Sequence, residues 1–325
     1  MERGTDMIWV IGSKGMLGQE ITKQLEEKSI VWVGSDSEVD ITNPEALDDF
    51  AESHDRSANR TGSTAAKGFV PQKITWVINC AGYTAVDDAE ENQELAQKLN
   101  AQGALNIARA TRKIGAKLIH ISTDYVFDGR TNRPYKEDDA KAPLSAYGRS
   151  KSEGEDLIQK EMTQYYILRT SWLYGFDGDN FVYSMTKQMN QNQSIKVVND
   201  QKGCPTNAVD LASLIIKIIE TSANATRLFG KNSAIPYGLY NYTNLGETTW
   251  YDFARRICEF GKKYKRITNE CTVEPCATTD YPTRALRPYY SVLSKDKILS
   301  SMKMKIPSWE DSLEKFIKST RFCPR

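Results

Sequence analysis

Short apolar runs rich in β-branched residues alternate with longer segments of helical periodicity throughout the first half of the sequence. Alternating strands and helices favour a parallel sheet that is covered by helices on both faces. In a sheet of this kind the ligands bind at the carboxyl ends of the strands. The expected strands are 7–11, 31–33, 74–79 and 118–122, and the expected helices are 17–27 and 92–114.

The second half mixes the two kinds of segment less regularly. Strands are expected at 166–173 and 195–198, and amphipathic helices at 208–220 and 249–260. No proline- or glycine-rich linker marks a clean boundary, so we expect the two lobes to interleave. We predict a cofactor domain at 7–175 and a smaller, mostly substrate-binding α/β lobe at 176–325, with segments near 206–245 returning to the first domain. The polar stretch 53–72 shows neither the periodicity of a helix nor that of a strand, and it is expected to be a surface insertion.

Composition excludes several classes of function. The 325 residues carry 43 Lys+Arg against 42 Asp+Glu, a formal net charge of +1 at pH 7, so no global field draws the chain to nucleic acid or to anionic lipid. The mean hydropathy is −0.54, and no apolar run is long enough to cross a membrane. The six cysteines form no CxxC pair and no export signal is visible, which predicts free thiols and a cytoplasmic location. The two histidines belong to no recognisable metal-ligand set.

A glycine-rich turn directly follows the first expected strand and precedes the first expected helix. It reads Gly12-Ser-Lys-Gly15-Met-Leu-Gly18. Glycine permits the close approach of a pyrophosphate, and a helix N-terminus presents free N–H groups to it. The glycines are spaced three and three instead of following the G-x-G-x-x-G pattern, so an ordinary tight turn is the alternative. The position at the first strand–helix junction favours a dinucleotide site in a Rossmann-type, doubly wound sheet.

The end of the second expected strand bears on the choice of cofactor. It reads Val33-Gly34-Ser35-Asp36. An acidic residue here commonly bonds the ribose hydroxyls of NAD, whereas a basic residue accepts the 2′-phosphate of NADP. An aspartate that bonds the backbone of its own turn is the alternative interpretation. The expected cofactor is NADH or NADPH, and Asp36 favours NADH.

Side chains suited to carbonyl chemistry follow at the carboxyl edge of the same sheet. Thr123 comes directly after the strand at 118–122, and Tyr147 and Lys151 are four residues apart on one face of an expected helix. An ammonium beside a phenol lowers the phenol pKa from its usual value of about 10. The lysine can also bond the nicotinamide ribose, while the threonine hydroxyl orients a substrate carbonyl. These residues predict the reduction of a ketone, and an exposed helix pair is the alternative for Tyr147 and Lys151.

Longer strings extend over both halves of the chain. They include Ser122-Thr-Asp-Tyr-Val-Phe-Asp-Gly129, Tyr147-Gly-Arg-Ser-Lys151, Arg169-Thr-Ser-Trp172-Leu-Tyr, Asn199-Asp-Gln-Lys-Gly203-Cys-Pro-Thr206 and Thr248-Thr-Trp-Tyr-Asp-Phe253. Together they resemble the extended short-chain dehydrogenase/reductases, and within them the branch of the dTDP-4-dehydrorhamnose reductases. The resemblance covers nearly the whole chain. It implies NAD(P)H-dependent reduction of the C4 ketone of dTDP-4-dehydro-6-deoxy-L-mannose to dTDP-L-rhamnose.

The resemblance also implies further site residues. For the cofactor these are Gly15, Met16 and Leu17 around the pyrophosphate, Asp40 and Ile41 beside the adenine, and Gly82, Tyr83 and Thr84 near the nicotinamide. Asp124 and Trp172 are expected to hold the hexose, with a tryptophan of the core as the alternative for Trp172. Arg287 is a candidate for the substrate diphosphate because a guanidinium matches phosphate oxygens, and an ordinary surface arginine is the alternative.

The resemblance leaves several choices open. Some relatives bind a divalent metal between subunits, but only Glu20 matches such a ligand set here, so no metal is expected. Another nucleotide-linked 4-keto-6-deoxy sugar is an alternative substrate, and a non-catalytic regulatory subunit on the same fold is an alternative function. The expected partner is a small nucleotide-sugar molecule, and a homodimer is a further expectation.

Overall fold

The computed structural model describes residues 6–54, 72–227 and 235–324. A six-stranded sheet with the order β10-β5-β4-β3-β1-β2 forms its larger part, and every neighbouring pair is parallel. The strands are β1 (Asp6–Ile11), β2 (Trp32–Ser35), β3 (Lys73–Asn79), β4 (Lys117–Thr123), β5 (Tyr165–Thr170) and β10 (Gly238–Asn241). The predicted α/β class with a doubly wound parallel sheet is confirmed.

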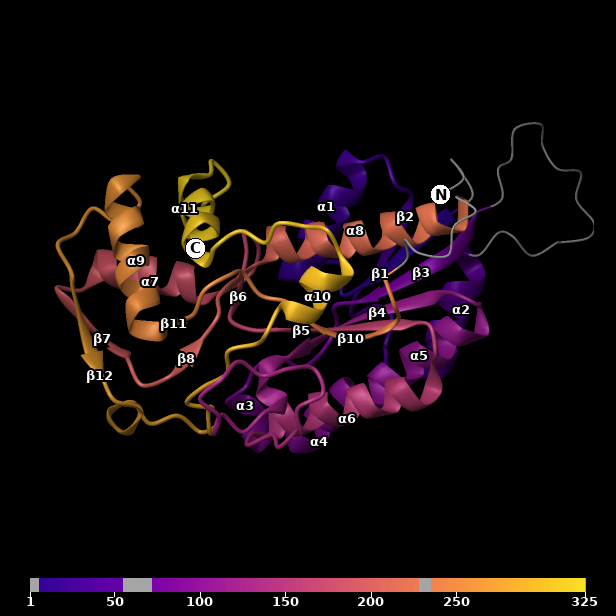
Figure 1. Cartoon of the computed structure of the whole chain (residues 1–325), viewed down its shortest axis with the longest axis horizontal. Coiled ribbons are helices and arrows are strands. Elements are labelled where there is room, and N and C mark those ends of the chain that lie inside the picture. Colours follow the sequence, from indigo (N-terminus) through magenta and orange to yellow (C-terminus); the bar gives the residue numbers. More distant parts are fainter. Residues whose placement is uncertain (1–5, 55–71, 228–234, 325) are drawn as a thin grey trace, which may run out of the picture.

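Helices cover both faces of this sheet (Figure 1). The helices α1 (Met16–Glu27) and α8 (Ala208–Arg227) pack together on one face, and α2 (Pro44–His54), α5 (Gly103–Lys113) and α6 (Ala146–Glu161) lie on the other. Successive residues of β1 therefore enter different cores: Ile8 packs in the cluster with α1 and α8, and Trp9 in the cluster with α2 and α5. This double burial explains why the strand is continuously apolar.

The helix expected at 92–114 is interrupted in the structure. After the short helices α3 (Asp88–Glu91) and α4 (Gln93–Gln97), the chain forms one π-helical turn, η1 (Lys98–Gln102), before α5 begins. Such turns are rare inside helices and often lie at functional sites. The buried Asn100 belongs to this turn.

A smaller lobe adjoins the carboxyl edge of the sheet and lies at the left of Figure 1. Its parallel pair β7 (Ser194–Val198) and β12 (Thr272–Cys276) packs with α7 (Phe181–Gln191), α9 (Trp250–Lys263) and α11 (Trp309–Lys318). Short pairs connect it to the sheet domain: β6 (Leu173–Tyr174) with β9 (Thr206–Asn207), and β8 (Lys202–Gly203) with β11 (Thr248–Thr249). The remaining elements are α10 (Asp296–Ser301) and the 3₁₀ turns η2 (Asp124–Val126) and η3 (Thr278–Asp280).

The chain passes between the two lobes more than once. The elements α8 and β10 belong to the sheet layer, although elements of the smaller lobe precede and follow them in the sequence. The predicted boundary between 7–175 and 176–325 stays a prediction. Most of the expected insertion at 53–72 lies outside the described residues, because α2 ends at His54 and the description resumes at residue 72.

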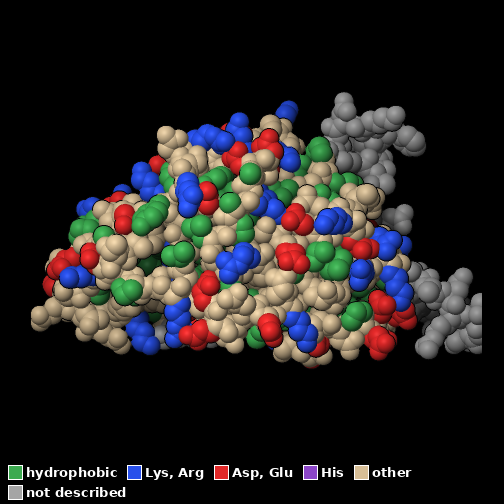
Figure 2. Space-filling view, turned by 90° about the horizontal axis from the view of Figure 1, so that it is seen from below, with side chains coloured by type: hydrophobic (Ala, Val, Ile, Leu, Met, Phe, Trp, Pro, Cys, Tyr) green, Lys and Arg blue, Asp and Glu red, His purple; other side chains and the backbone are tan. Residues whose placement is uncertain are grey.

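Three global features bear on the sequence predictions. All six cysteines are free thiols, as expected. No helix in the described part of the chain has the length and apolarity that a membrane crossing needs. Figure 2 shows Lys and Arg side chains interspersed with Asp and Glu over the face in view, so this face presents no extended field of one sign.

Candidate active site

A cleft of about 960 Å³ lies at the carboxyl ends of the strands, between the sheet and the smaller lobe. It extends from the glycine-rich turn after β1 to Asp179 and Trp250 of the smaller lobe. All the sequence-predicted site residues except Tyr83 and Arg287 line it. The predicted residues that line the cleft are Gly12, Gly15, Met16, Leu17, Gly18, Asp36, Asp40, Ile41, Gly82, Thr84, Thr123, Asp124, Tyr147, Lys151 and Trp172.

The glycine-rich turn is packed too tightly for larger residues. Gly12 has φ +76°, and a Cβ atom there would lie 2.8 Å from the backbone nitrogen of Ala81. A Cβ atom on Gly18 would overlap the carbonyl oxygen of Gly12. Gly15 is the N-cap of α1, and no side chain caps this helix end. The first N–H groups of α1 therefore lie at the cleft without a side-chain acceptor, which suits an anionic group.

Asp36 is tied to the same turn. Its carboxylate accepts hydrogen bonds from the backbone N–H of Lys14 at 3.0 Å and of Ser37 at 2.9 Å. The Lys14 ammonium forms an ion pair with Glu38 at 2.9 Å. Asp36 thus bonds the local backbone, as the turn interpretation predicts, and also lines the cleft.

Asn100 holds the segment after β3 against the cleft. Its Oδ1 accepts from the Tyr83 N–H at 2.8 Å, and its Nδ2 donates to the Tyr83 carbonyl at 3.0 Å. A Cβ atom on Gly82 would lie 2.7 Å from this Oδ1. The Tyr83 side chain packs against the cluster of Ala89, Ala96 and Ala146, and Tyr83 is not among the residues that line the cleft. Sequence reasoning missed Asn100 because helical periodicity does not reveal a π turn.

Asp40 and Ile41 line the other side of the cleft, next to α2. The Asp40 carboxylate accepts from the backbone and the hydroxyl of Thr42, both at 2.8 Å, and these bonds lower its pKa. Ile41 is buried, and its carbonyl accepts from Asn106 at 3.1 Å. The site therefore has an ordered wall where the resemblance implies an adenine.

The start of α6 is fixed against the end of β4. Ser145 caps the helix by accepting from the Gly148 N–H at 3.1 Å. A Cβ atom on Gly148 would overlap the carbonyl oxygen of Tyr125, so the helix and the turn η2 are in close contact. This contact places Tyr147 beside Thr123. The Tyr125 ring meets the Tyr147 ring edge to face, with centroids 5.8 Å apart.

The pKa of Tyr147 is shifted in the direction opposite to the sequence prediction. Burial raises it to about 12, although the neighbouring Thr123 hydroxyl acts to lower it. The predicted lowering by Lys151 is therefore wrong for this structure, because desolvation of the phenolate outweighs any favourable neighbour. The Lys151 ammonium instead donates to the Ile121 carbonyl at 2.6 Å and lies 3.5 Å from His120 Nε2.

Burial shifts two other groups of the cleft toward neutrality. The pKa of Lys151 falls to about 8 because burial disfavours its ammonium, while the charge of Glu155 opposes the shift. The pKa of Asp124 rises to about 7, again through burial, and Thr123 donates to its Oδ1 at 3.1 Å. Perturbed groups gathered in one cleft are typical of an active site.

Trp172 and Arg287 have partners that the sequence did not indicate. The Trp172 indole stacks on Trp250, with centroids 3.6 Å apart and an interplanar angle of 12°. Arg287 donates to both carboxylate oxygens of Asp87, at 3.0 and 2.6 Å, and does not line the cleft. Trp250 was missed because its position at the start of an amphipathic helix reads as ordinary core.

Residues 6–54, 72–227 and 235–324 contain no group of three or more His, Cys, Asp or Glu side chains that could hold a metal ion. The carboxylate of Glu20, the one residue that matched a metal-binding pattern, is paired with Arg321 at 2.8 Å.

Comparison with known proteins identifies relatives over nearly the whole chain. The family model described as "RmlD substrate binding domain" matches residues 6–322. The dTDP-4-dehydrorhamnose reductase of Sinorhizobium fredii is 37% identical over 256 residues, which cover 78% of this chain and 83% of the relative. The probable dTDP-4,6-dihydroxy-2-methyloxan-3-one 4-ketoreductase of Streptomyces antibioticus is 35% identical over 94% of this chain and 93% of its own length. The crystal structure of the dTDP-4-dehydrorhamnose reductase of Bacillus anthracis in complex with NADP is 33% identical, with a TM-score of 0.81 and coverage of 96% of this chain and 98% of that one.

Proposed function

The chain belongs to the family described as the RmlD substrate binding domain, and on this premise we propose that it is an NAD(P)H-dependent sugar-nucleotide oxidoreductase. The reaction we infer is reduction of the C4 ketone of dTDP-4-dehydrorhamnose, which yields dTDP-L-rhamnose. One observation carries the proposal: Thr123, Tyr147 and Lys151 line the same cleft as the glycine-rich turn. The turn suits a dinucleotide, and the three side chains supply what carbonyl reduction needs beside it.

The residues of the cleft fit a nicotinamide dinucleotide. The uncapped N-terminus of α1 suits its pyrophosphate. Glycine at positions 12 and 18 lets the turn pack closely against α1 and the segment after β3, because a Cβ atom at either position would meet the backbone there. When bound, the reduced cofactor supplies the hydride. Lys151 carries ammonium donors beyond the one that bonds Ile121, and these suit the hydroxyls of the nicotinamide ribose.

Tyr147 suits the proton transfer that completes a reduction. The carbonyl oxygen gains a proton in this reaction, so the donor must be protonated at neutral pH. Burial raises the pKa of Tyr147 to about 12 and thereby keeps it a neutral phenol. Thr123, which lies beside Tyr147 at the end of β4, suits the orientation of the carbonyl oxygen.

The charges at the end of β2 favour NADH as the preferred cofactor. Asp36 and Glu38 lie there, and the ammonium of the neighbouring Lys14 is paired with Glu38. A 2′-phosphate would meet the Asp36 carboxylate, whereas a 2′-hydroxyl could donate to it.

The choice of sugar has a second candidate. The similarity to the Streptomyces antibioticus 4-ketoreductase supports another dTDP-linked 4-keto sugar as substrate. A non-catalytic regulatory subunit is disfavoured, because Thr123, Tyr147 and Lys151 have no chemical use in a pure binding module.

An absorbance assay at the nicotinamide band tests the function. The protein is mixed with NADH and NADPH in parallel, and the keto sugar is generated in situ from dTDP-glucose by the upstream dehydratase and epimerase. We expect oxidation of the cofactor only when the keto sugar is present, and faster with NADH. A 4-keto sugar made without the epimerase separates the two substrate candidates. Absence of oxidation with every keto sugar would refute the reductase and favour the regulatory subunit.

Location and assembly are parts of the same proposal. We infer that the enzyme works in the cytoplasm, where reduced dinucleotides and nucleotide sugars are present together. A homodimer is a further prediction, and light scattering on the purified protein measures the mass that decides it.

A further inference from the structure

Glu155 is a buried carboxylate that the reaction described above does not use. It lies one helical turn beyond Lys151 on α6, and its relative exposure is 0%. Arg169 of β5 donates to both of its oxygens, at 2.9 and 2.7 Å. Ser122, near the end of β4, donates to Oε1 at 2.6 Å. The carboxylate therefore connects α6 to the carboxyl ends of two neighbouring strands.

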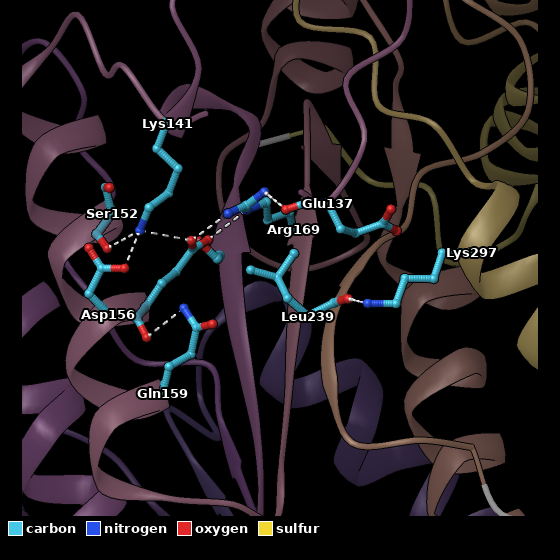
Figure 3. A network of polar contacts seen from close by, with 10 residues as sticks. Glu137, Lys141, Ser152, Asp156, Gln159, Arg169, Leu239 and Lys297 are labelled. Carbon is cyan, nitrogen blue, oxygen red and sulfur yellow. Dashed lines mark hydrogen bonds and ion pairs between the residues drawn. The ribbon is translucent and has the colours of Figure 1, made fainter. Parts of the chain in front are cut away.

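A second cation completes this network. Lys141 Nζ lies 3.4 Å from Glu155 Oε2 and 2.8 Å from the half-exposed Asp156 carboxylate. Figure 3 shows Asp156 and Ser152 beside Lys141, and Arg169 next to Glu137 at the centre of the drawn residues. Replacing a buried ion pair by apolar side chains is often neutral or stabilising for a protein. A contribution to the free energy of unfolding therefore does not by itself explain why this buried pair is present.

The anchoring points of Glu155 are next to residues of the cleft. Ser122 immediately precedes Thr123, and Arg169 immediately precedes Thr170, which also lines the cleft. Lys151 lies on the same face of α6, four residues before the carboxylate. A displacement of this carboxylate would therefore move α6 relative to the strand ends that present the threonines.

The charge of Glu155 also acts on Lys151. The titratable groups facing Lys151 from other elements are His120 of β4 and Cys80, which follows β3. Burial lowers the pKa of His120 and raises that of Cys80 to about 12, so both are neutral near pH 7. Tyr147 on α6 is neutral as well. Among these groups of the described structure, Glu155 is the one whose negative charge favours the ammonium, and the cations Arg169 and Lys141 lie beyond it.

We propose that Glu155 is a positioning residue for the reduction, which fixes α6 against β4 and β5 and keeps Lys151 charged at the pH where the enzyme works. Its effect is exerted through Lys151 and the strand ends, without contact with the substrate. The inference rests on the proposed function for the role of Lys151 at the cofactor ribose. Its test therefore uses cofactor binding in the absence of sugar, which gives a result even if the sugar assignment fails.

The experiment measures the dissociation constants of NADH and NADPH from pH 6 to pH 10 for three variants and the unmodified protein. In Glu155→Gln, the pH at which affinity falls as Lys151 loses its proton should decrease by about one unit. The double variant Glu155→Gln, Arg169→Met does not leave the Arg169 charge buried and unpaired. Its melting temperature should therefore be close to that of the unmodified protein, while its pH midpoint stays as low as in Glu155→Gln. Asp156→Asn, which removes a half-exposed carboxylate from the same helix and network, should keep the original midpoint.

Three results would overturn the proposal. An unchanged midpoint in Glu155→Gln would show that its charge does not act on Lys151. A midpoint restored in the double variant would show that the carboxylate only balances Arg169. Failure of both variants to fold, with a folded Asp156→Asn, would assign Glu155 a purely structural role.

Discussion

Tyr147 lies beside Thr123 in the cleft, is partly buried, and has a raised pKa that keeps its hydroxyl protonated near neutral pH. Tyr147→Phe removes this hydroxyl and keeps the ring that packs against Tyr125. Because the phenol donates the proton, we expect kcat to fall by about 10²- to 10⁴-fold while the dissociation constant of the cofactor stays nearly constant. Single-turnover kinetics and a binding titration measure the two quantities.

A matched control removes a phenol outside the cleft. Tyr165 is half-buried at the start of β5 and does not line the cleft, so Tyr165→Phe should leave kcat nearly unchanged. An unaltered kcat in Tyr147→Phe would contradict the assigned proton transfer.

Asp36 provides a residue-scale test of cofactor choice. Asp36→Asn removes the charge and keeps an oxygen that can accept from the Lys14 N–H. Because a 2′-phosphate would no longer meet a carboxylate, we expect the ratio of kcat/KM for NADPH to that for NADH to rise by about tenfold, which corresponds to about 1.4 kcal/mol. Asp48→Asn, a matched charge loss on α2 next to Lys113, should leave the ratio unchanged. An unchanged ratio in Asp36→Asn would show that another group selects the cofactor.

At the scale of elements, the sequence predicted those strands and turns whose residues are determined by burial and backbone conformation within the segment itself. The strand β1 and the turn after it were predicted because a run buried on both faces is continuously apolar and the turn requires glycine. The π turn at Lys98–Gln102 was not predicted, since the hydrogen bonds of its Asn100 to the Tyr83 backbone join residues 17 positions apart. The pairing of Arg287 with Asp87 joins residues 200 positions apart, and no short pattern encodes such a contact.

The junction of the glycine-rich turn with α1 gives an element-scale prediction. A Cβ atom on Gly18 would overlap the Gly12 carbonyl, so Gly18→Ala must move the helix away from the turn. We expect a loss of about 1–3 kcal/mol in the free energy of unfolding, as overpacking typically causes. The dissociation constant of the cofactor should rise by at least about tenfold, since the N–H groups of α1 no longer meet the pyrophosphate.

Thermal melts and cofactor titrations measure both effects. Glu26→Ala, on the exposed end of the same helix, controls for a general change in α1. Cofactor affinity equal to that of the unmodified protein in Gly18→Ala would rule out this helix end as the pyrophosphate site.

At the scale of the whole molecule, a formal net charge of +1 must be reconciled with two anionic ligands. The charges visible in Figure 2 are interspersed, so the surface gives no long-range attraction on that face. The cleft instead offers local devices: the uncapped start of α1 and the ammonium of Lys151. Near neutrality is therefore compatible with the proposed function, because recognition of the anions is built into the cleft.

The buried Asp124 links the cleft to the stability of the whole fold. Burial raises its pKa from 3.8 to about 7. A carboxyl group whose folded-state pKa is raised favours the fold below its unfolded pKa, and this contribution is lost as pH rises through the folded value. Relative to a neutral side chain, the unmodified protein should therefore lose stability between about pH 4 and pH 7.

Asp124→Asn places an isosteric neutral group at this position. The variant should match the unmodified protein near pH 4 and exceed its unfolding free energy by on the order of 2–4 kcal/mol at pH 8. Asp128→Asn is the control of opposite sign: hydrogen bonds from the Arg130 N–H and Tyr135 lower the pKa of Asp128, so its loss should destabilise the protein at pH 8. Thermal melts of the three proteins across this pH range measure the difference. An uncompensated buried charge can only raise the free energy of the folded state. If the Asp124→Asn variant is less stable than the unmodified protein at pH 8, the ionised carboxylate is therefore compensated within the fold.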